Sequence, residues 1–247
     1  MMLLSSPKEE YVVHIENALR ALERIYPVFE PTIKRVLKSS NANFVILNDA
    51  FRRMIIFHDL GKLTKEWQRI AEKEQKENRK LHKPAHAPIG AAYLYKILPE
   101  DLKEPISFAV AIHHSDKGLL GDNIEKPDSR AIRDGIVDYE ADNIVWDEDT
   151  EKLLDKYFPE DAKELSLNDL TVMARGLRRW ARGVGVMEEH NRRIQASLVH
   201  HILKLCDISA ASEREEYKEI EDPFGGWLMV EKINEYVKNM EKRRKDE

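Results

Sequence analysis

The stretch Ile55-Ile56-Phe57-His58-Asp59-Leu60-Gly61-Lys62 carries the strongest structural and chemical signal in the chain. It closes a segment whose apolar residues recur at helical spacing, and glycine is the residue type that commonly follows a helix end. The pattern predicts a buried helix that starts near Asn48 and stops at Gly61. An imidazole and a carboxylate therefore follow a run of apolar side chains directly.

The His58-Asp59 pair has two interpretations. Taken alone, it is a histidine that interacts with the C-terminal dipole of a helix, followed by a surface acid. The other interpretation is a metal centre, because divalent ions that hydrolyse phosphodiesters need imidazole and carboxylate ligands. A site for two ions also needs a bridging group. Asp59 is the natural candidate, since its two oxygens can each face a different ion.

Further potential ligands lie in apolar or helical surroundings, namely His14, His86, His113, His114 and Asp207. A lone histidine on an apolar helix, such as His14, is more often a hydrogen-bonded core residue. The adjacent imidazoles of His113 and His114 follow an apolar helix and cost desolvation unless something satisfies them. Asp207 is, with Lys204, one of two charges in 194–211, and a buried aspartate needs a partner such as a metal. The full set together favours a metal site.

The rest of the chain predicts an all-α class in one domain over residues 1–247. Ser6-Pro7-Lys8-Glu9 has the form of a capping box, which would open a helix that contains His14 and that Pro27 ends. We find no alternating strand pattern of any length and no internal repeat. Further helices are expected after Pro88, from Pro105 at its first position to His114, from about Asn191 past Ala211, and from Trp227 to Lys242.

Two segments depart from this regularity. Residues 115–168 are punctuated by glycine and proline and are rich in acidic residues. They predict an irregular excursion between core helices, with a short helix near 149–157. The segment could be a lid, a docking surface for a partner protein, or disordered. Its acidity would repel DNA and favours a role that faces protein. Residues 243–247 are expected to form a disordered tail.

Composition narrows the function classes. The chain has 247 residues, of which 42% are apolar and 34% charged, and a formal net charge of −5 gives no overall attraction to nucleic acid. The single cysteine, Cys206, excludes an internal disulfide and a cysteine-rich zinc site, and it fits a reducing cytoplasm. We find no apolar run of about 18 residues, so no membrane span is expected.

A local basic surface is still available. The densest arginine cluster surrounds Trp180 and comprises Arg175, Arg178, Arg179, Arg182, Arg192 and Arg193. Such cations can follow a nucleic-acid backbone while an aromatic ring stacks on a base. The alternative, which composition alone favours, is a solvated basic face with Trp180 in the core.

The ordered set of histidines and aspartates resembles the HD phosphohydrolase superfamily, from His14 to the end of the last motif at residue 212. Within that superfamily the chain most resembles the HD nuclease of type I CRISPR interference, in its form as a subunit separate from the helicase. Three stretches carry this likeness: His58-Asp59-Leu60-Gly61-Lys62 with Trp67-Gln68, His86-Ala87-Pro88-Ile89-Gly90-Ala91, and Asp207 with Ala211-Ser212-Glu213.

The resemblance implies an HD-domain helical bundle around a dinuclear metal centre. It implies that His14, His58, Asp59 and Asp207 hold one ion, and that Asp59, His86, His113 and His114 hold the other. His82 is a competing candidate for the position of His86. Lys62 would steady the scissile phosphate or protonate the leaving oxygen, although a role as a cation near a helix C-terminus explains it nearly as well. Ser212 is a further candidate contact.

The same resemblance implies an activity and partners. It implies two divalent ions from among Mn, Mg, Ni, Co and Fe, and hydrolysis of single-stranded DNA, or of single-stranded RNA. The cleavage would be endonucleolytic or would proceed from the 3′ end. The implied partners are a separate CRISPR helicase subunit and the surveillance complex. No nucleotide-binding glycine loop is present in the sequence, so helicase activity would belong to another chain.

Two rival functions stay open. One is a nucleotide or cyclic-dinucleotide phosphohydrolase of the same superfamily. The Gly-Tyr-Pro signature of its cyclic-dinucleotide branch is missing here, and Lys62-Leu63-Thr64 follows the HD pair where the nucleotide triphosphohydrolases usually have prolines. The other rival is a non-catalytic scaffold stabilised by metal. A complete second ligand set argues against it, because a structural role needs only one closed site.

Overall fold

The computed structural model describes residues 2–37, 44–114, 134–138, 142–153 and 155–213, together with isolated positions between 232 and 242. Helices dominate this part of the chain and confirm the all-α prediction. The α-helices of the described residues are α1 (Tyr11–Leu37), α2 (Phe44–Phe57), α3 (Lys65–Glu77), α4 (Ala87–Ile97), α5 (Glu100–Ala111), α8 (Leu167–Arg182) and α9 (Val186–Ser212).

Short strands and 3-10 turns connect the helices. Strands β1 and β2 form one antiparallel hairpin, and β3 and β4 form another. The elements are β1 (Leu4–Ser6), β2 (Glu9–Glu10), β3 (Val137–Asp138), β4 (Asn143–Ile144), η1 (Leu60–Leu63), η2 (Glu148–Lys152) and η3 (Glu160–Glu164).

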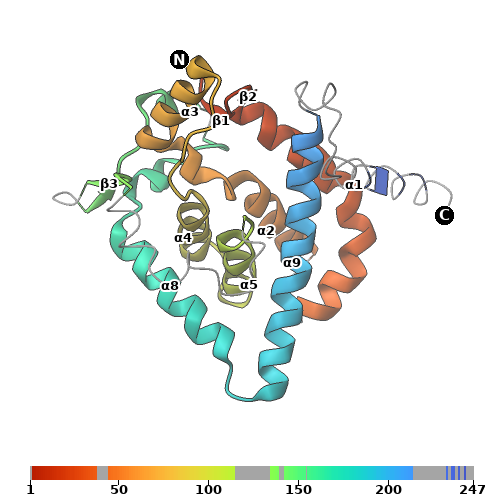
Figure 1. The fold of residues 1–247 in the computed structure, drawn as a ribbon. Coiled ribbons are helices and arrows are strands. Elements are labelled where there is room, and N and C mark those ends of the chain that lie inside the picture. Colours follow the sequence, from red (N-terminus) through yellow and green to blue (C-terminus); the bar gives the residue numbers. More distant parts are fainter. Residues whose placement is uncertain are drawn as a thin grey trace.

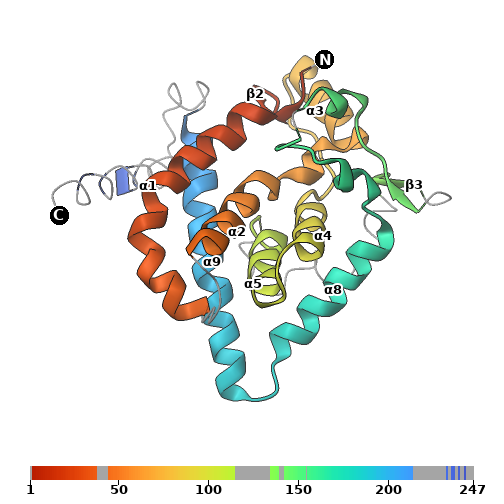
Figure 2. The same cartoon turned by 180° about the vertical axis from the view of Figure 1, so that it is seen from behind.

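The core lies between three long helices. In Figure 1, α2, α4 and α5 lie between α8 on one side and α1 with α9 on the other, and Figure 2 shows the same arrangement from behind. Helix α1 packs along α9, and α5 contacts both α4 and α9. Phe51 and Ile55 of α2 are fully buried, as are Ile106 of α5 and Leu203 of α9. Through this packing, α2 contacts α1, α4, α5 and α9.

The predicted N-terminal capping box does not form. Ser6 ends β1, and α1 starts only at Tyr11, whose backbone N–H donates to Leu3 O at 2.9 Å. Gln68 of α3 holds the hairpin in place, because its side chain accepts from Leu4 N at 2.9 Å and donates to Leu4 O at 2.8 Å. Tertiary hydrogen bonds therefore override a local helix-start pattern.

Two prolines were assigned the wrong positions. Helix α1 continues through Pro27 and Pro31 to Leu37, and Pro105 lies inside α5 instead of at its first position. A proline inside a helix removes one hydrogen bond and bends the helix, and α1 is visibly bent in Figures 1 and 2. Burial of Ile33 and Leu37 beyond the prolines supplies packing that offsets this cost.

The irregular excursion is confirmed where it is described. Lys65 N donates to Val145 O at 3.0 Å and Asp147 N to Leu63 O at 3.0 Å, so the segment lies along the chain that follows the HD motif. The expected short helix is a 3-10 turn, η2, and ends earlier than predicted. Residues 115–133, 139–141, 154 and 243–247 lie outside the described residues, as does most of the expected last helix.

Helix α8 was not anticipated from sequence. A capping box opens it, in which the Ser166 hydroxyl accepts from Asp169 N and the Asp169 carboxylate accepts from Ser166 N at 2.9 Å. Among the described residues, no helix is both long and apolar enough to span a bilayer.

Candidate metal centre

The packing brings all seven predicted ligands to one place. His58 and Asp59 follow α2, His14 lies on α1 and Asp207 on α9, while His86 precedes α4 and His113 and His114 follow α5. Two glycines make this approach possible. A Cβ on Gly61 would lie 2.4 Å from His86 O, and one on Gly90 would lie 2.2 Å from Phe57 O. Backbones can approach this closely only where the side chain is missing.

His14, His58 and Asp207 form what we call the deep group, on one side of Asp59. His14 Nε2 lies 3.4 Å from Asp59 Oδ2 and 3.3 Å from Asp207 Oδ1. His58 Nε2 lies 3.4 Å from the same Asp59 oxygen and 3.8 Å from Asp207 Oδ1. The two imidazoles thus face the same oxygen of Asp59 and the same oxygen of Asp207.

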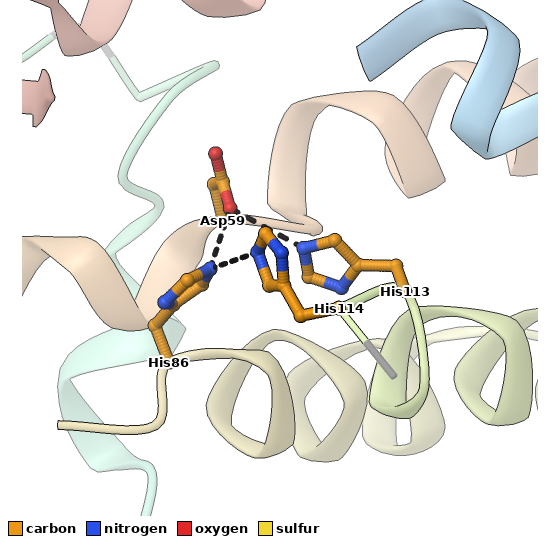
Figure 3. Close-up of side chains that lie close together, drawn as sticks. All are labelled: Asp59, His86, His113 and His114. Carbon is orange, nitrogen blue, oxygen red and sulfur yellow. Dashed lines mark hydrogen bonds and ion pairs between the residues drawn. The ribbon is translucent and has the colours of Figure 1, made fainter. Parts of the chain in front are cut away.

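His86, His113 and His114 form the open group, on the other side of Asp59 (Figure 3). His86 Nε2 lies 3.0 Å and His113 Nε2 3.5 Å from Asp59 Oδ1. His86 Nε2 also lies 2.7 Å from His114 Nε2. Asp59 therefore turns one oxygen toward each group, as a bridging carboxylate would.

The backbone orients two of the imidazoles. His58 Nδ1 lies 2.8 Å from Ile55 O, and His113 Nδ1 lies 2.6 Å from Val110 O. Because a carbonyl oxygen can only accept, each Nδ1 carries a hydrogen, and in the neutral imidazole each Nε2 therefore keeps its lone pair. Both Nε2 atoms face Asp59. This is the arrangement that metal-binding histidines adopt.

Unsatisfied atoms at the centre fit a metal. His14 Nε2, His58 Nε2 and His113 Nε2 are buried, and none makes a hydrogen bond within the described residues. Each such atom costs about 1–3 kcal/mol unless something pairs with it. Nitrogen and carboxylate donors suit divalent ions of the first transition row, and the carboxylates also suit Mg²⁺. The donor atoms lie close enough together for two ions that share Asp59.

Burial and charge at the centre shift the pKa values of both aspartates and of His86. Burial alone would raise the pKa of Asp59, but the nearby His58 and Lys62 hold it well below its usual range. Burial would also raise the pKa of Asp207, but interactions with His14 and His58 hold it well below its usual range. Burial lowers the pKa of His86 to about 4. At neutral pH the carboxylates are therefore charged and His86 is neutral.

Lys62 lies inside the centre and not on the surface. Its ammonium is 2.6 Å from Asp59 Oδ2, and its side chain is 8% exposed. Gln68 fixes the local backbone by donating to Lys62 O at 2.7 Å. The Trp67-Gln68 pair noted in the sequence thus ties the N-terminal hairpin to the turn that carries Asp59.

Sequence reasoning missed Glu9. Its carboxylate lies 3.2 Å from His14 Nδ1 and accepts from the Ser5 hydroxyl at 2.6 Å. Burial lowers the pKa of His14, but Asp207 and Glu9 together raise it above its usual value. Glu9 was assigned to a capping box, and only the hairpin of β1 and β2 brings it to α1. No local pattern signals this contact.

Other predicted residues lie apart from the ligands. His82 is exposed and lines a separate hollow with Glu66, whereas His86 contacts Asp59. The Ser212 hydroxyl donates to Ser209 O at 2.7 Å on its own helix.

The arginine cluster lies on α8 and α9, near the turn at the bottom of Figure 1. Arg178 donates to Ala174 O at 3.1 Å, Arg192 contacts Glu188 and Arg193 contacts Glu189. Trp180 packs against the core, with its ring 5.8 Å from Phe108. The geometry thus puts the ring in the core, and the exposed side chains of Arg179 and Arg182 remain on the surface.

The all-α bundle gathers five histidines and a second aspartate near Asp59, which is the arrangement of an HD-type metal centre. Residues 12–216 match the family model described as Cas3, HD domain, so the chain belongs to this CRISPR-associated family. The fold is similar to that of the CRISPR-associated Cas3 HD domain protein MJ0384 from Methanocaldococcus jannaschii, with a TM-score of 0.63 and 20% identity. That match covers 82% of this chain and 99% of the other. The comparison with curated proteins gives no significant match.

Proposed function

We propose that the chain is a nuclease that hydrolyses phosphodiester bonds of single-stranded DNA, and of single-stranded RNA, during CRISPR interference. The observation that carries the proposal is the position of Asp59, which presents one oxygen to each of two separate ligand groups. A shared carboxylate between two ligand sets is the usual design of two-metal phosphodiesterases. Membership in the Cas3 HD domain family supports the CRISPR setting.

The proposed metal ligands fall into the deep and the open group. The deep group with Asp59 would hold one ion, and the open group with Asp59 would hold the other. Bound divalent ions of Mn, Mg, Ni, Co or Fe would activate a water and neutralise phosphate oxygens during in-line attack. His58 and His113 need no rearrangement to present a lone pair, because backbone carbonyls already fix their rings.

Asp59 and Lys62 are the proposed catalytic residues. Asp59 orients both ligand groups, and the Lys62 ammonium lies beside its Oδ2 atom. A cation at this depth can donate a hydrogen bond to a phosphate oxygen or a proton to the leaving oxygen. Little water reaches Lys62, so its charge acts with little screening.

The arginines are proposed to extend the substrate path. Arg178, Arg179 and Arg182 lie on α8, and Arg192 and Arg193 lie on α9. Changing Arg178 and Arg179 together to Ala should weaken DNA binding and reduce its salt dependence, while the metal content stays unchanged. Binding is measured from about 50 to 200 mM salt. If the dependence of DNA affinity on salt concentration is unaltered, the arginine cluster is a solvated surface without a role in DNA binding.

The proposed partners are a separate CRISPR helicase subunit and the surveillance complex, in the cytoplasm. Membership in the Cas3 HD domain family supports a role beside the CRISPR interference machinery. The acidic segment over 115–168 is the proposed docking surface, since it would repel DNA.

The deciding experiment is cleavage of labelled single-stranded DNA by protein stripped with EDTA. Mn²⁺, Mg²⁺ or Ni²⁺ is then added back, and a panel of nucleotides and cyclic dinucleotides is tested in parallel. The variant that carries both His58→Ala and Asp59→Ala serves as the control. DNA cleavage that needs metal and both residues supports the nuclease. Intact DNA beside a hydrolysed nucleotide would instead indicate a nucleotide phosphohydrolase, and no turnover at all would indicate a scaffold.

A further inference from the structure

A cavity of about 300 Å³ adjoins the open group. The N-terminal hairpin, the start of α3 and the coil before α4 enclose it. The lining residues that matter here are Ser6, Lys62, Trp67, Lys83, His86 and His114. Because two walls are open-group imidazoles, a substrate whose scissile phosphate contacts Asp59 would extend into this space.

Two ammonium groups make the cavity attractive to an anion. Lys62 Nζ and Lys83 Nζ each lie 5.7 Å from the centre of the Trp67 ring. Glu74 contacts Lys83 and also accepts from Leu81 N at 3.2 Å, so it fixes both the lysine and the coil that carries it. An ammonium has three hydrogens, so Lys83 can bind Glu74 and still donate to a ligand.

The cavity also contains an unused hydrogen-bonding group. The Ser6 hydroxyl oxygen is buried and makes no hydrogen bond within the described residues. Ser6 is the last residue of β1 and lines the same cavity as the two lysines. A buried hydroxyl without a partner is unfavourable, and a phosphate oxygen would satisfy it.

The shape argues for a phosphate with its sugar and not for a base. Trp67 is only 2% exposed, so its face is covered and cannot stack on a base. A volume of about 300 Å³ is at the lower limit of ligand sites and suits one such unit.

We propose that this cavity binds the phosphate adjacent to the scissile one, through Lys83 and Ser6. The inference rests on the proposed nuclease function and adds a subsite to it. Lys83 is thereby a substrate-binding residue outside the metal ligands, and the enzyme favours substrates that carry a second phosphate one nucleotide away.

Three thymidine dinucleotides test this subsite. Each has one phosphodiester bond; the first has no terminal phosphate, the second has a 5′ phosphate and the third a 3′ phosphate. With metal bound, one terminal phosphate should raise kcat/KM about ten-fold, as expected for one charge-assisted hydrogen bond. Lys83→Gln should abolish this gain, Ser6→Ala should reduce it, and Lys83→Arg should keep it.

Lys76→Gln is the matched control, since Lys76 also pairs with a glutamate on α3 but is 73% exposed. It should keep the gain. Equal losses by Lys83→Gln on all three dinucleotides, with reduced metal content, would mean that Lys83 only supports the coil of His86 and would overturn the subsite. So would the absence of any gain while wild type still cleaves a longer DNA strand. An uncleaved longer strand would refute the nuclease function itself, and the subsite with it.

Discussion

The deep and open groups share Asp59 but differ in their surroundings. In the deep group, His14 and His58 have no exposed surface and Asp207 is 15% exposed. In the open group His113 is equally buried, but His86 is 13% exposed and His114 lies at the surface. The deep group is held by long helices that pack on each other, whereas the open group stands at the wall of a cavity.

This difference in surroundings indicates that the two ligand groups bind their ions with different strength. A ligand set carried by α1, α2 and α9, which pack on each other, is rigid, so it should hold its ion tightly. A set beside a cavity must admit the phosphate, and two of its nitrogens, on His86 and His114, are only 2.7 Å apart before any ligand separates them. We therefore expect the first ion to be structural as well as catalytic, and the second to bind more weakly.

The largest effect should come from Asp59→Ala, which removes the ligand that both groups share. Both ions should be lost and cleavage should fall to background, because each group then lacks the carboxylate oxygen that faces it. Metal analysis of the purified variant measures this directly. Normal turnover, or retention of two ions, would refute the assignment of Asp59 as the bridge.

Next in size is the contrast between His58→Ala and His114→Ala. The deep variant should lose the tightly held ion and much of its activity, and it leaves a space where a fully buried ring stood. The open variant should lose only the weaker ion. Titration of EDTA-stripped protein with Mn²⁺ gives the number and affinity of sites in each variant. Identical titrations of the two variants would show that the two groups bind metal equally well, and would refute the tighter binding proposed for the deep group.

A medium effect is expected from Gly90→Ala, which separates the groups without removing a ligand. Its methyl group would meet Phe57 O at 2.2 Å and His58 O at 2.8 Å, so α4 must move away from the end of α2. Overpacking of this kind costs roughly 1–3 kcal/mol, and each kcal/mol lowers Tm by about 2–4 °C in a domain of this size.

The control for that variant is Gly185→Ala, since a Cβ there meets nothing within 4 Å and the backbone is extended. It should leave Tm nearly unchanged. Thermal unfolding, followed with and without metal, compares the two variants. An equal Tm for both would show that α4 does not need the close approach at Gly90.

The sequence predicted the helical class and the gathering of ligands, because both depend on local patterns. Apolar spacing predicts buried helix faces, and an imidazole or carboxylate on such a face needs a partner. His14, His58 and Asp207 stood out for this reason, and the structure brings them together. Their roles as ligands stay predictions until metal binding is measured.

What the sequence could not predict depends on contacts between distant segments. The Ser6–Glu9 pattern favours a helix start, yet hydrogen bonds from Gln68, 64 residues away from Leu4, hold it as a hairpin. Pro27 and Pro105 were expected at helix boundaries, but tertiary packing keeps both inside helices. Local propensity is a weak prior when long-range contacts compete with it.

The smallest effect, and the finest test of the comparison, should come from Glu9→Gln. Its carboxylate lies 3.2 Å from His14 Nδ1 and so orients a ligand of the deep group alone. Loss of such a partner typically weakens metal binding about 10- to 100-fold. We expect the lower end, because the amide oxygen of glutamine can still accept from Nδ1.

The adjacent Glu10→Gln is the matched control, since Glu10 lies on the same strand but is exposed. Mn²⁺ titration should show a weaker tight site in Glu9→Gln, an unchanged weak site, and two normal sites in Glu10→Gln. If the weak site changes instead, Glu9 acts through the hairpin on the cavity wall and the two groups are coupled. A tight site that changes alone would show that the two groups can be tuned separately, although one aspartate joins them.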